Sequence, residues 1–162
     1  EQAGENRVAV SGVEGRAPTS TYKASIAYEN GYKILGTLCI PGPDAIEKAH
    51  IVADMIFERM AMHGHPILEE NRFVELFGTN VLYKGLVPAV EQPHEVMLRV
   101  GANGPDKKAL NTLGVELGPC FTSGPPGLTG AGGRPRATEV VGYWPALIDK
   151  KMIETSFTIE EV

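Results

Sequence analysis

The stretch that decides the fold is Pro41-Gly42-Pro43-Asp44-Ala45-Ile46-Glu47-Lys48-Ala49, which joins a strand pattern to a helical one. Gly42 suits an N-cap, Pro43 suits the first helical position because its φ is preset, and Asp44 suits the positive end of the helix dipole. We therefore expect a strand over residues 32–40 and a helix from Pro43 to about His63.

A second unit of the same kind follows 62 residues later in the chain. Residues 95–100 have a strand pattern, and Gly104-Pro105-Asp106 leads into a helix with Ala109, Leu110, Leu113 and Leu117 on one side. Further strands expected at residues 72–77 and 138–143 complete the order βαββαβ, the split-βαβ or ferredoxin-like arrangement. Two right-handed crossovers place both helices on one sheet face. The sequence predicts a single α+β domain over residues 1–162.

Two further strand patterns precede this arrangement. Residues 7–11 and 21–28 alternate polar and apolar, and Asn30-Gly31 is a strong signal for a tight turn. We therefore expect an extra amino-terminal hairpin, in which residues 21–28 pair with residues 32–40. Residues 78–93 have no regular pattern.

The apolar arc of the first predicted helix is wider than one face. Beyond the main stripe it carries Ile51, Val52, Met55 and Met62. One interpretation is that the helix packs against a partner, either another copy or another part of the same protein. The alternative is a cover of loops from the same chain.

Composition excludes several classes of function. The formal net charge is -5, and proteins that bind phosphate backbones need clustered Lys and Arg, so we expect no nucleic-acid or anionic-membrane partner. No apolar run reaches the roughly 20 residues of a membrane span. The only cysteines, Cys39 and Cys120, are too few for a disulfide framework, which favours a reducing cytoplasm. The chain begins with Glu1 rather than Met, and a fragment, a processed chain and one subunit of a split protein all stay open.

The candidate functional site is a glycine- and proline-rich stretch from Gly118 to Ala137. Long structureless loops inside compact domains are usually functional or disordered. Glycine backbone N–H groups, hydroxyls and two arginines together suit a carboxylate or phosphate. The predicted ligand-binding residues are Ser123, Gly124, Gly127, Thr129, Gly130, Gly133, Arg134 and Arg136. No Gly-Lys-Ser/Thr follows, so this is not a P-loop, and a subunit-interface or mobile loop is the alternative reading.

Other candidate sites are weaker. His63 and His65 with Glu69 and Glu70 lack a recognised metal-ligand spacing, so we predict no metal site. Cys120 has no base partner that the sequence reveals, which favours a buried small hydrophobe over a nucleophile. Lys23 is expected on a solvated strand face. The catalytic residues, and whether the chain is an enzyme, stay unknown at this point.

Several stretches in order along the chain resemble the acyclic terpene utilisation (AtuA-like) family. They are residues 7–16 (RVAVSGVEGR) with Pro18 and Tyr22-Lys23, residues 42–49 (GPDAIEKA), residues 94–100 (HEVMLRV), residues 123–130 (SGPPGLTG), residues 133–136 (GRPR) and residues 143–145 (YWP).

The resemblance implies a role in catabolism of acyclic isoprenoid or related branched acyl compounds, as coenzyme A thioesters. The sequence itself requires no cofactor. Proteins of the family are longer, and this chain is similar to the carboxy-terminal part of their main conserved region. The resemblance thus implies a component of a small-molecule enzyme that a second chain or an amino-terminal half completes, in a homo- or hetero-oligomer. A non-catalytic structural or assembly subunit is the alternative. Reaction type, substrate and oligomeric state stay open.

Overall fold

The computed structural model describes residues 1–160, and the chain divides into two units. Unit 1 comprises Glu1–Ala27 and Tyr143–Val162, and unit 2 comprises Tyr28–Gly142. Every buried residue in the described part of the chain lies in unit 2. The hydrophobic core therefore belongs to unit 2 alone, and whether the chain is one domain stays a prediction.

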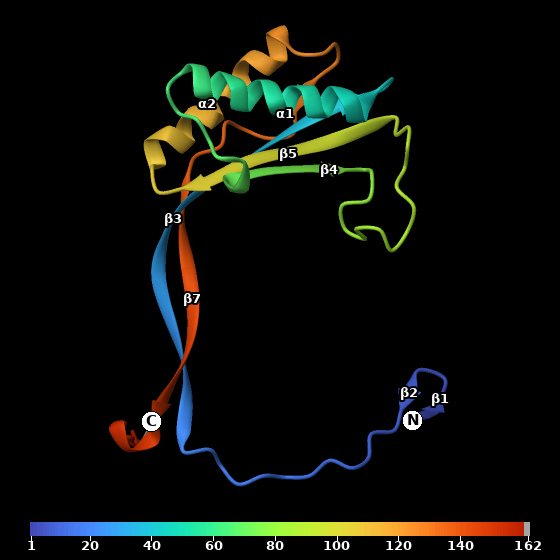
Figure 1. Cartoon of the computed structure of the whole chain (residues 1–162). Helices are drawn as coiled ribbons and strands as arrows, with labels where there is room; N and C mark the ends of the chain where they lie inside the picture. Colours follow the sequence, from blue (N-terminus) through green and yellow to red (C-terminus); the bar gives the residue numbers. More distant parts are fainter. Residues whose placement is uncertain (161–162) are drawn as a thin grey trace. The chain divides into compact units, whose positions relative to one another are not determined.

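The core is built on a five-stranded sheet (Figure 1). Its strands are β3 (Thr21–Pro41), β4 (Arg72–Phe77), β5 (Glu95–Gly104), β6 (Thr129–Gly130) and β7 (Thr138–Asp149). They are arranged in the order β4-β5-β3-β6, and β7 also pairs with β3. The β4–β5, β5–β3 and β3–β6 pairs are antiparallel, and Leu76, Leu98 and Leu38 lie opposite one another across three strands. This leucine row lies at the centre of the core.

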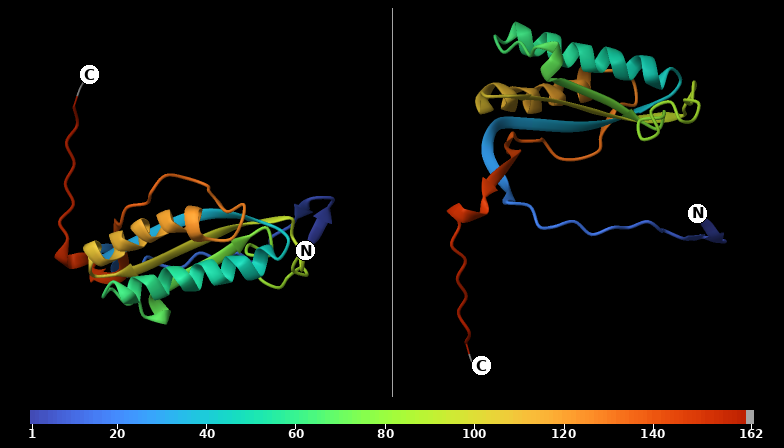
Figure 2. Two further views of the ribbon diagram at one scale, coloured as in Figure 1. Left: turned by 90° about the horizontal axis from the view of Figure 1, so that it is seen from above. Right: turned by 60° about the horizontal axis from the view of Figure 1, so that its bottom comes forward.

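Two helices cover one face of this sheet. They are α1 (Ala45–Met62) and α2 (Lys107–Ser123), which contact each other and β5. Figure 2 shows them side by side on the same face. A short 3-10 helix, η1 (Glu69–Asn71), precedes β4. The predicted α+β class is confirmed, with the expected element order, whereas the ferredoxin-like label stays a prediction. None of these helices is long and apolar enough to cross a membrane, as far as residues 1–160 are concerned.

The hairpin predicted at Asn30-Gly31 is wrong, because β3 runs through it as one strand. Gly31 does adopt a positive φ of 73°, and a side chain there would meet the carbonyl oxygen of Gly104 at 2.8 Å. The left-handed residue therefore makes a local irregularity beside β5 and does not reverse the chain. A different hairpin joins β1 (Gln2–Gly4) to β2 (Arg7–Val8), so the strand expected over residues 7–11 shrinks to two residues.

The two Gly-Pro-Asp sequences start their helices differently. Asp44, not Gly42, is the N-cap of α1; its φ is 60°, and its side chain forms no capping hydrogen bond. Asp106 keeps the extended conformation usual for an N-cap, and its carboxylate accepts hydrogen bonds from the N–H groups of Lys108 (2.8 Å) and Ala109 (3.1 Å). The predicted helix start at Pro43 is wrong, because the left-handed Asp44 delays α1 to Ala45.

The apolar surface predicted on α1 is only partly present. Val52 is fully buried and Met55 packs against the core. Ile51 and Met62 are 56% and 83% exposed. The four residues therefore do not form one exposed surface. A partner that packs against α1 stays a prediction, and only Ile51 and Met62 are exposed to contact it.

Candidate functional site

The loop predicted to begin at Gly118 begins six residues later. Helix α2 continues through Pro119 to Ser123, with Gly124 as its C-cap. Pro119 has no N–H to donate to the turn before it, but Gly118 lacks the Cβ that would clash with the proline ring. Leu117 and Cys120 are both buried, so core packing holds the helix together at this point.

The remaining loop, residues 124–137, is fixed to unit 2 at several points. Leu128 and Ala137 are buried, and Thr129 and Gly130 form β6 against Cys39 and Leu38 of β3. The N–H of Ala137 also donates to Asn111 Oδ1 in α2 at 2.9 Å. The loop therefore lies along the edge of the sheet beside β3 and is hydrogen-bonded to α2.

A cavity of about 220 Å³ lies between this loop, α2 and β3. Its apolar side is formed by Leu38, Val115, Leu117 and Phe121, and Arg134 supplies the charged group of the lining. The other lining residues are Thr37, Gly114, Gly118, Gly132, Gly133 and Pro135. Such a lining suits a small apolar group that carries one negative charge.

Close approach of the loop to α2 depends on Gly114. A Cβ at this position would lie 2.6 Å from the carbonyl oxygen of Pro135, too close for an atom to occupy. The glycine thus lets the loop backbone cross the helix at the edge of the cavity.

The structure brings together three of the eight predicted ligand-binding residues. Gly133 and Arg134 line the cavity, and Gly130 lies against Phe121, which also lines it. The other five, which are Ser123, Gly124, Gly127, Thr129 and Arg136, do not line it. Ser123 and Gly124 end the helix, and Gly127 has a φ of 81° and lies against Pro41.

Both loop arginines are available to an anion. Arg134 and Arg136 are exposed, and within the described residues neither takes part in an ion pair. Lys23, on β3, is also exposed, as the sequence predicted. The loop therefore presents two cations that no carboxylate of residues 1–160 neutralises.

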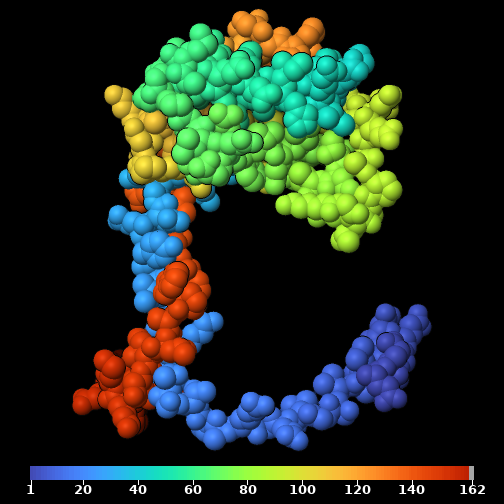
Figure 3. Space-filling view, in the orientation of Figure 1, coloured from blue at the N-terminus to red at the C-terminus, as the bar shows by residue number. Residues whose placement is uncertain are grey.

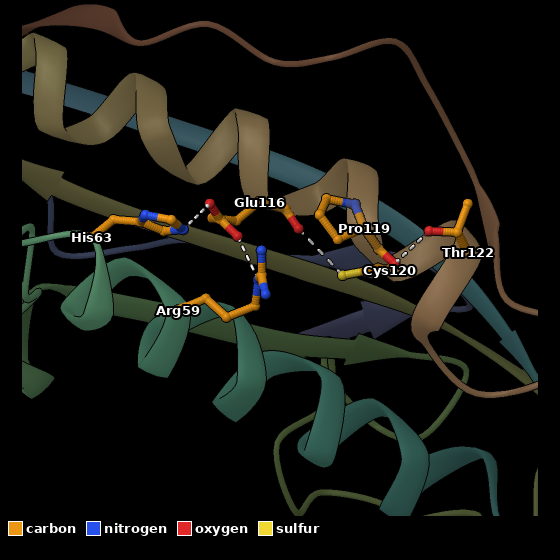
Figure 4. Close-up of polar contacts among 6 residues, drawn as sticks. All are labelled: Arg59, His63, Glu116, Pro119, Cys120 and Thr122. Atoms are coloured by element: carbon orange, nitrogen blue, oxygen red, sulfur yellow. Dashed lines mark hydrogen bonds and ion pairs between the residues drawn. The ribbon is translucent and has the colours of Figure 1, made fainter.

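A second polar cluster, between the two helices, was missed by the sequence analysis (Figure 4). The Nε–H of Arg59 in α1 donates to Oε2 of Glu116 in α2 at 2.6 Å, and His63 Nε2 lies 3.3 Å from Oε1. Glu116 is only 4% exposed. The sequence does hold one indication of this cluster: Glu116 lies next to Leu117 on the apolar side of α2, and a buried carboxylate needs a partner.

Cys120 lies beside this cluster and is fully buried, as the sequence indicated. Its Sγ contacts the Glu116 carbonyl oxygen at 3.5 Å (Figure 4). Burial raises the pKa of the Cys120 thiol above its ordinary value, and the Arg59 charge opposes this only in part. The thiol therefore stays protonated at neutral pH, which does not suit a nucleophile.

The histidines considered for a metal site do not gather with Glu69 and Glu70. His63 lies beside Glu116, and no group of three or more His, Cys, Asp or Glu side chains in residues 1–160 is placed to hold a metal ion. A larger cavity, of about 670 Å³, lies at the start of α1, but Asp44, Glu47 and Glu91 line it. Three carboxylates do not suit an anionic ligand.

Comparison with known proteins supports one family. The model of a family described as acyclic terpene utilisation family protein AtuA matches residues 1–159. No curated protein matches the chain, and no solved structure matches it.

Proposed function

The chain belongs to the acyclic terpene utilisation family AtuA, and on that premise we propose that its loop and α2 hold the charged end of a branched acyl compound. Membership supports involvement in acyclic terpene utilisation. The proposal about the ligand rests on one observation: apolar side chains and Arg134 line the same cavity.

The chemistry of the lining matches a branched carboxylate or acyl thioester. Leu117 is buried, and Val115 and Phe121 are 45% and 49% exposed, so the three side chains give the hydrocarbon an apolar surface that is open to solvent on one side. Arg134 gives an oxygen of the acyl group a charged donor. Arg136 lies outside the lining and is exposed, so it suits a second anionic group, such as a phosphate of coenzyme A.

Cavity size limits what part of a ligand enters. About 220 Å³ is the volume of roughly seven waters at about 30 Å³ each, below the roughly 300–1,000 Å³ of drug-sized pockets. A branched five-carbon acid has seven non-hydrogen atoms and fits this volume. A longer isoprenoid would place only its branched or acyl end here.

The chain contributes binding groups rather than a complete catalytic centre. No His, Cys, Asp or Glu is among the described residues that line the cavity, so no general acid or base is supplied from its walls. We infer that a second chain or domain supplies the reacting groups. This makes the protein a component of a small-molecule-metabolising enzyme.

Calorimetry with 3-methylbutanoate and with its coenzyme A thioester tests the proposal. Arg134→Ala should weaken binding of both ligands by about 1.5–3 kcal/mol, the contribution of a charged hydrogen bond. Arg136→Ala should weaken binding of the thioester more than that of the free acid. Lys108→Ala, which removes an exposed cation of α2 outside the cavity, is the matched control and should leave both affinities unchanged. Equal affinities for wild type and Arg134→Ala would reject the proposal.

The alternative function, a structural or assembly subunit, is favoured by a different observation. Unit 1 has no buried residue in its described part, and Ile51 and Met62 of α1 are exposed. If assembly is the whole function, none of the loop variants changes any ligand affinity, while removal of the apolar surface changes the oligomeric state.

A further inference from the structure

We propose that Thr37 makes the cavity beside the loop prefer an acyl group that carries a hydroxyl, so that the ligand is a branched hydroxy acid or its thioester. The inference rests on the proposed function, because it takes Arg134 as the residue that binds the acyl end of the ligand. Thr37 belongs to β3 and not to the loop, so the composition of the loop does not point to it.

The lining of the cavity holds few polar side chains. Thr37 and Arg134 are the only two among the described residues that line it. An arginine side chain only donates hydrogen bonds, whereas a threonine hydroxyl both donates and accepts them. Thr37 is therefore the one side chain of the lining that can accept a hydrogen bond from a hydroxyl of the ligand.

The Thr37 hydroxyl lies where the loop passes the edge of β3. The N–H of Ala131 donates to the Thr37 carbonyl oxygen there, at 3.4 Å. A Cβ placed on Gly132, which also lines the cavity, would lie 3.7 Å from Thr37 Oγ1 and near no other atom beyond its neighbours in the chain. Because Gly132 has no side chain, the hydroxyl stays uncovered on the loop side.

The Thr37 hydroxyl has no partner in the described part of the chain. Thr19, Thr79, Thr112 and Thr122 donate their hydroxyls to main-chain carbonyl oxygens, whereas Thr37 Oγ1 forms no hydrogen bond within residues 1–160. The strand does not require this hydroxyl either, because valine has the same shape and suits a strand equally well. The hydroxyl is therefore free to bind a ligand.

The cavity is open to a ligand of this kind. Val115 and Phe121 in its lining are 45% and 49% exposed, and Figure 3 shows atoms of α2 and of the loop, in orange, at the surface of unit 2. A hydroxyl adds one oxygen atom to a five-carbon acid, which the volume of about 220 Å³ still admits. Arg134 on the acyl oxygen and Thr37 on the hydroxyl then hold the ligand at two points and fix its orientation.

Calorimetry of the whole chain with 3-methylbutanoate and with 3-hydroxy-3-methylbutanoate tests the inference. Wild type should bind the hydroxy acid roughly fivefold more tightly, the equivalent of one net hydrogen bond. Thr37→Val should weaken binding of the hydroxy acid about fivefold or more and change binding of 3-methylbutanoate less than about twofold. Thr138→Val, the same substitution at an exposed strand residue outside the lining, is the control and should leave both affinities unchanged.

The outcomes separate this inference from the proposed function. If wild type binds neither acid, or if Arg134→Ala binds both as tightly as wild type, the proposed function fails and the role of Thr37 fails with it. If binding depends on Arg134 but wild type does not prefer the hydroxy acid, or Thr37→Val keeps the preference, only the role of Thr37 is overturned.

Gly132→Ala is a second variant, which decides the question if Thr37→Val does not fold. Its methyl group lies beside Thr37 Oγ1 and should weaken binding of the hydroxy acid more than binding of 3-methylbutanoate. Equal weakening of the two would show that the Thr37 hydroxyl does not contact the ligand, and would overturn the inference.

Discussion

Glu116 is the only charged residue that is buried in the described part of the chain, and its partners come from the other helix. Burying a carboxylate is unfavourable unless a cation compensates it, and Arg59 does so at 2.6 Å. This ion pair therefore links α1 to α2, in addition to the apolar contacts of the core that the two helices share.

Replacing Glu116 by Ala should lower the free energy of unfolding by about 1.5–3 kcal/mol, because Arg59 loses the acceptor of a charged hydrogen bond. Urea unfolding followed by circular dichroism measures the change. Glu58→Ala removes an exposed carboxylate of α1 that forms no ion pair among residues 1–160, and it should change stability by less than about 0.5 kcal/mol. Similar losses in the two variants would contradict the role of Glu116.

Gly114 is the second single residue on which the site depends, because it allows the Pro135 carbonyl to approach α2. Gly114→Ala should cost about 1–3 kcal/mol, since the added methyl must displace the loop. Gly133→Ala is the control: a Cβ there has no atom within 4 Å, and the substitution should be neutral or slightly stabilising. Thermal unfolding of both variants checks the prediction, which fails if Gly114→Ala is as stable as wild type.

At the scale of elements, the two helix starts show what an N-cap contributes. The N–H groups of Ala109 and Lys108 bind the Asp106 carboxylate and hold its pKa below the ordinary value of 3.8. A lowered folded-state pKa means that the ionised cap stabilises α2 fully above the ordinary pKa. That contribution is lost as the pH falls through the lower, folded-state pKa.

Asparagine caps helices without titrating in this range. The stability of wild type relative to Asp106→Asn should therefore fall as the pH is lowered from about 5 to about 2. Urea midpoints of the two proteins at each pH measure the difference. Asp44→Asn is the control, because Asp44 forms no side-chain cap and asparagine tolerates its positive φ. A constant difference between wild type and Asp106→Asn at all pH values would contradict the prediction.

At the scale of the whole molecule, every fully buried residue among residues 1–160 lies in unit 2, which separates the chain into parts of different stability. At low protein concentration, trypsin should cut after Arg16 and Lys150 in unit 1 before it cuts after Arg59 and Lys108 in the helices of unit 2. Mass spectrometry of early fragments measures the order. The reverse order would show that unit 1 has stability that its exposed residues do not explain.

The regular elements of unit 2 were predictable because their patterns are local. Strand β4 has the bounds expected for it, Arg72–Phe77. Helix α2 buries Leu110, Leu113 and Leu117 of the expected stripe, whereas Ala109 is only half-buried. The turn predicted at Asn30-Gly31 does not form, because contacts with a distant segment decide the structure there. Its positive φ is a local preference, but pairing of β3 with β5 starts at Tyr32 opposite Gly104 and continues to Pro41 opposite Glu95, which outweighs that preference.

The candidate site was predictable in part. Glycine, proline and arginine content pointed to Gly133 and Arg134, which line the cavity, and to Gly130, which lies against Phe121 beside it. That they bind a ligand stays a prediction. Residue content could not show that Ser123 and Arg136 lie outside the cavity lining, because their positions depend on where α2 ends and on the direction in which the loop crosses the helix. Arg59 and Glu116 are 57 residues apart, so no spacing rule relates them.

The α+β class and the apolar stripes of the helices follow from the sequence, since periodicity acts over a few neighbouring residues. The choice of the loop as a ligand site stays a prediction. Only the tertiary structure decided that β3 is continuous, that α2 passes Pro119, and that Glu116 meets Arg59. These features depend on contacts between distant segments, where the burial of apolar surface and the pairing of a buried charge outweigh local preference.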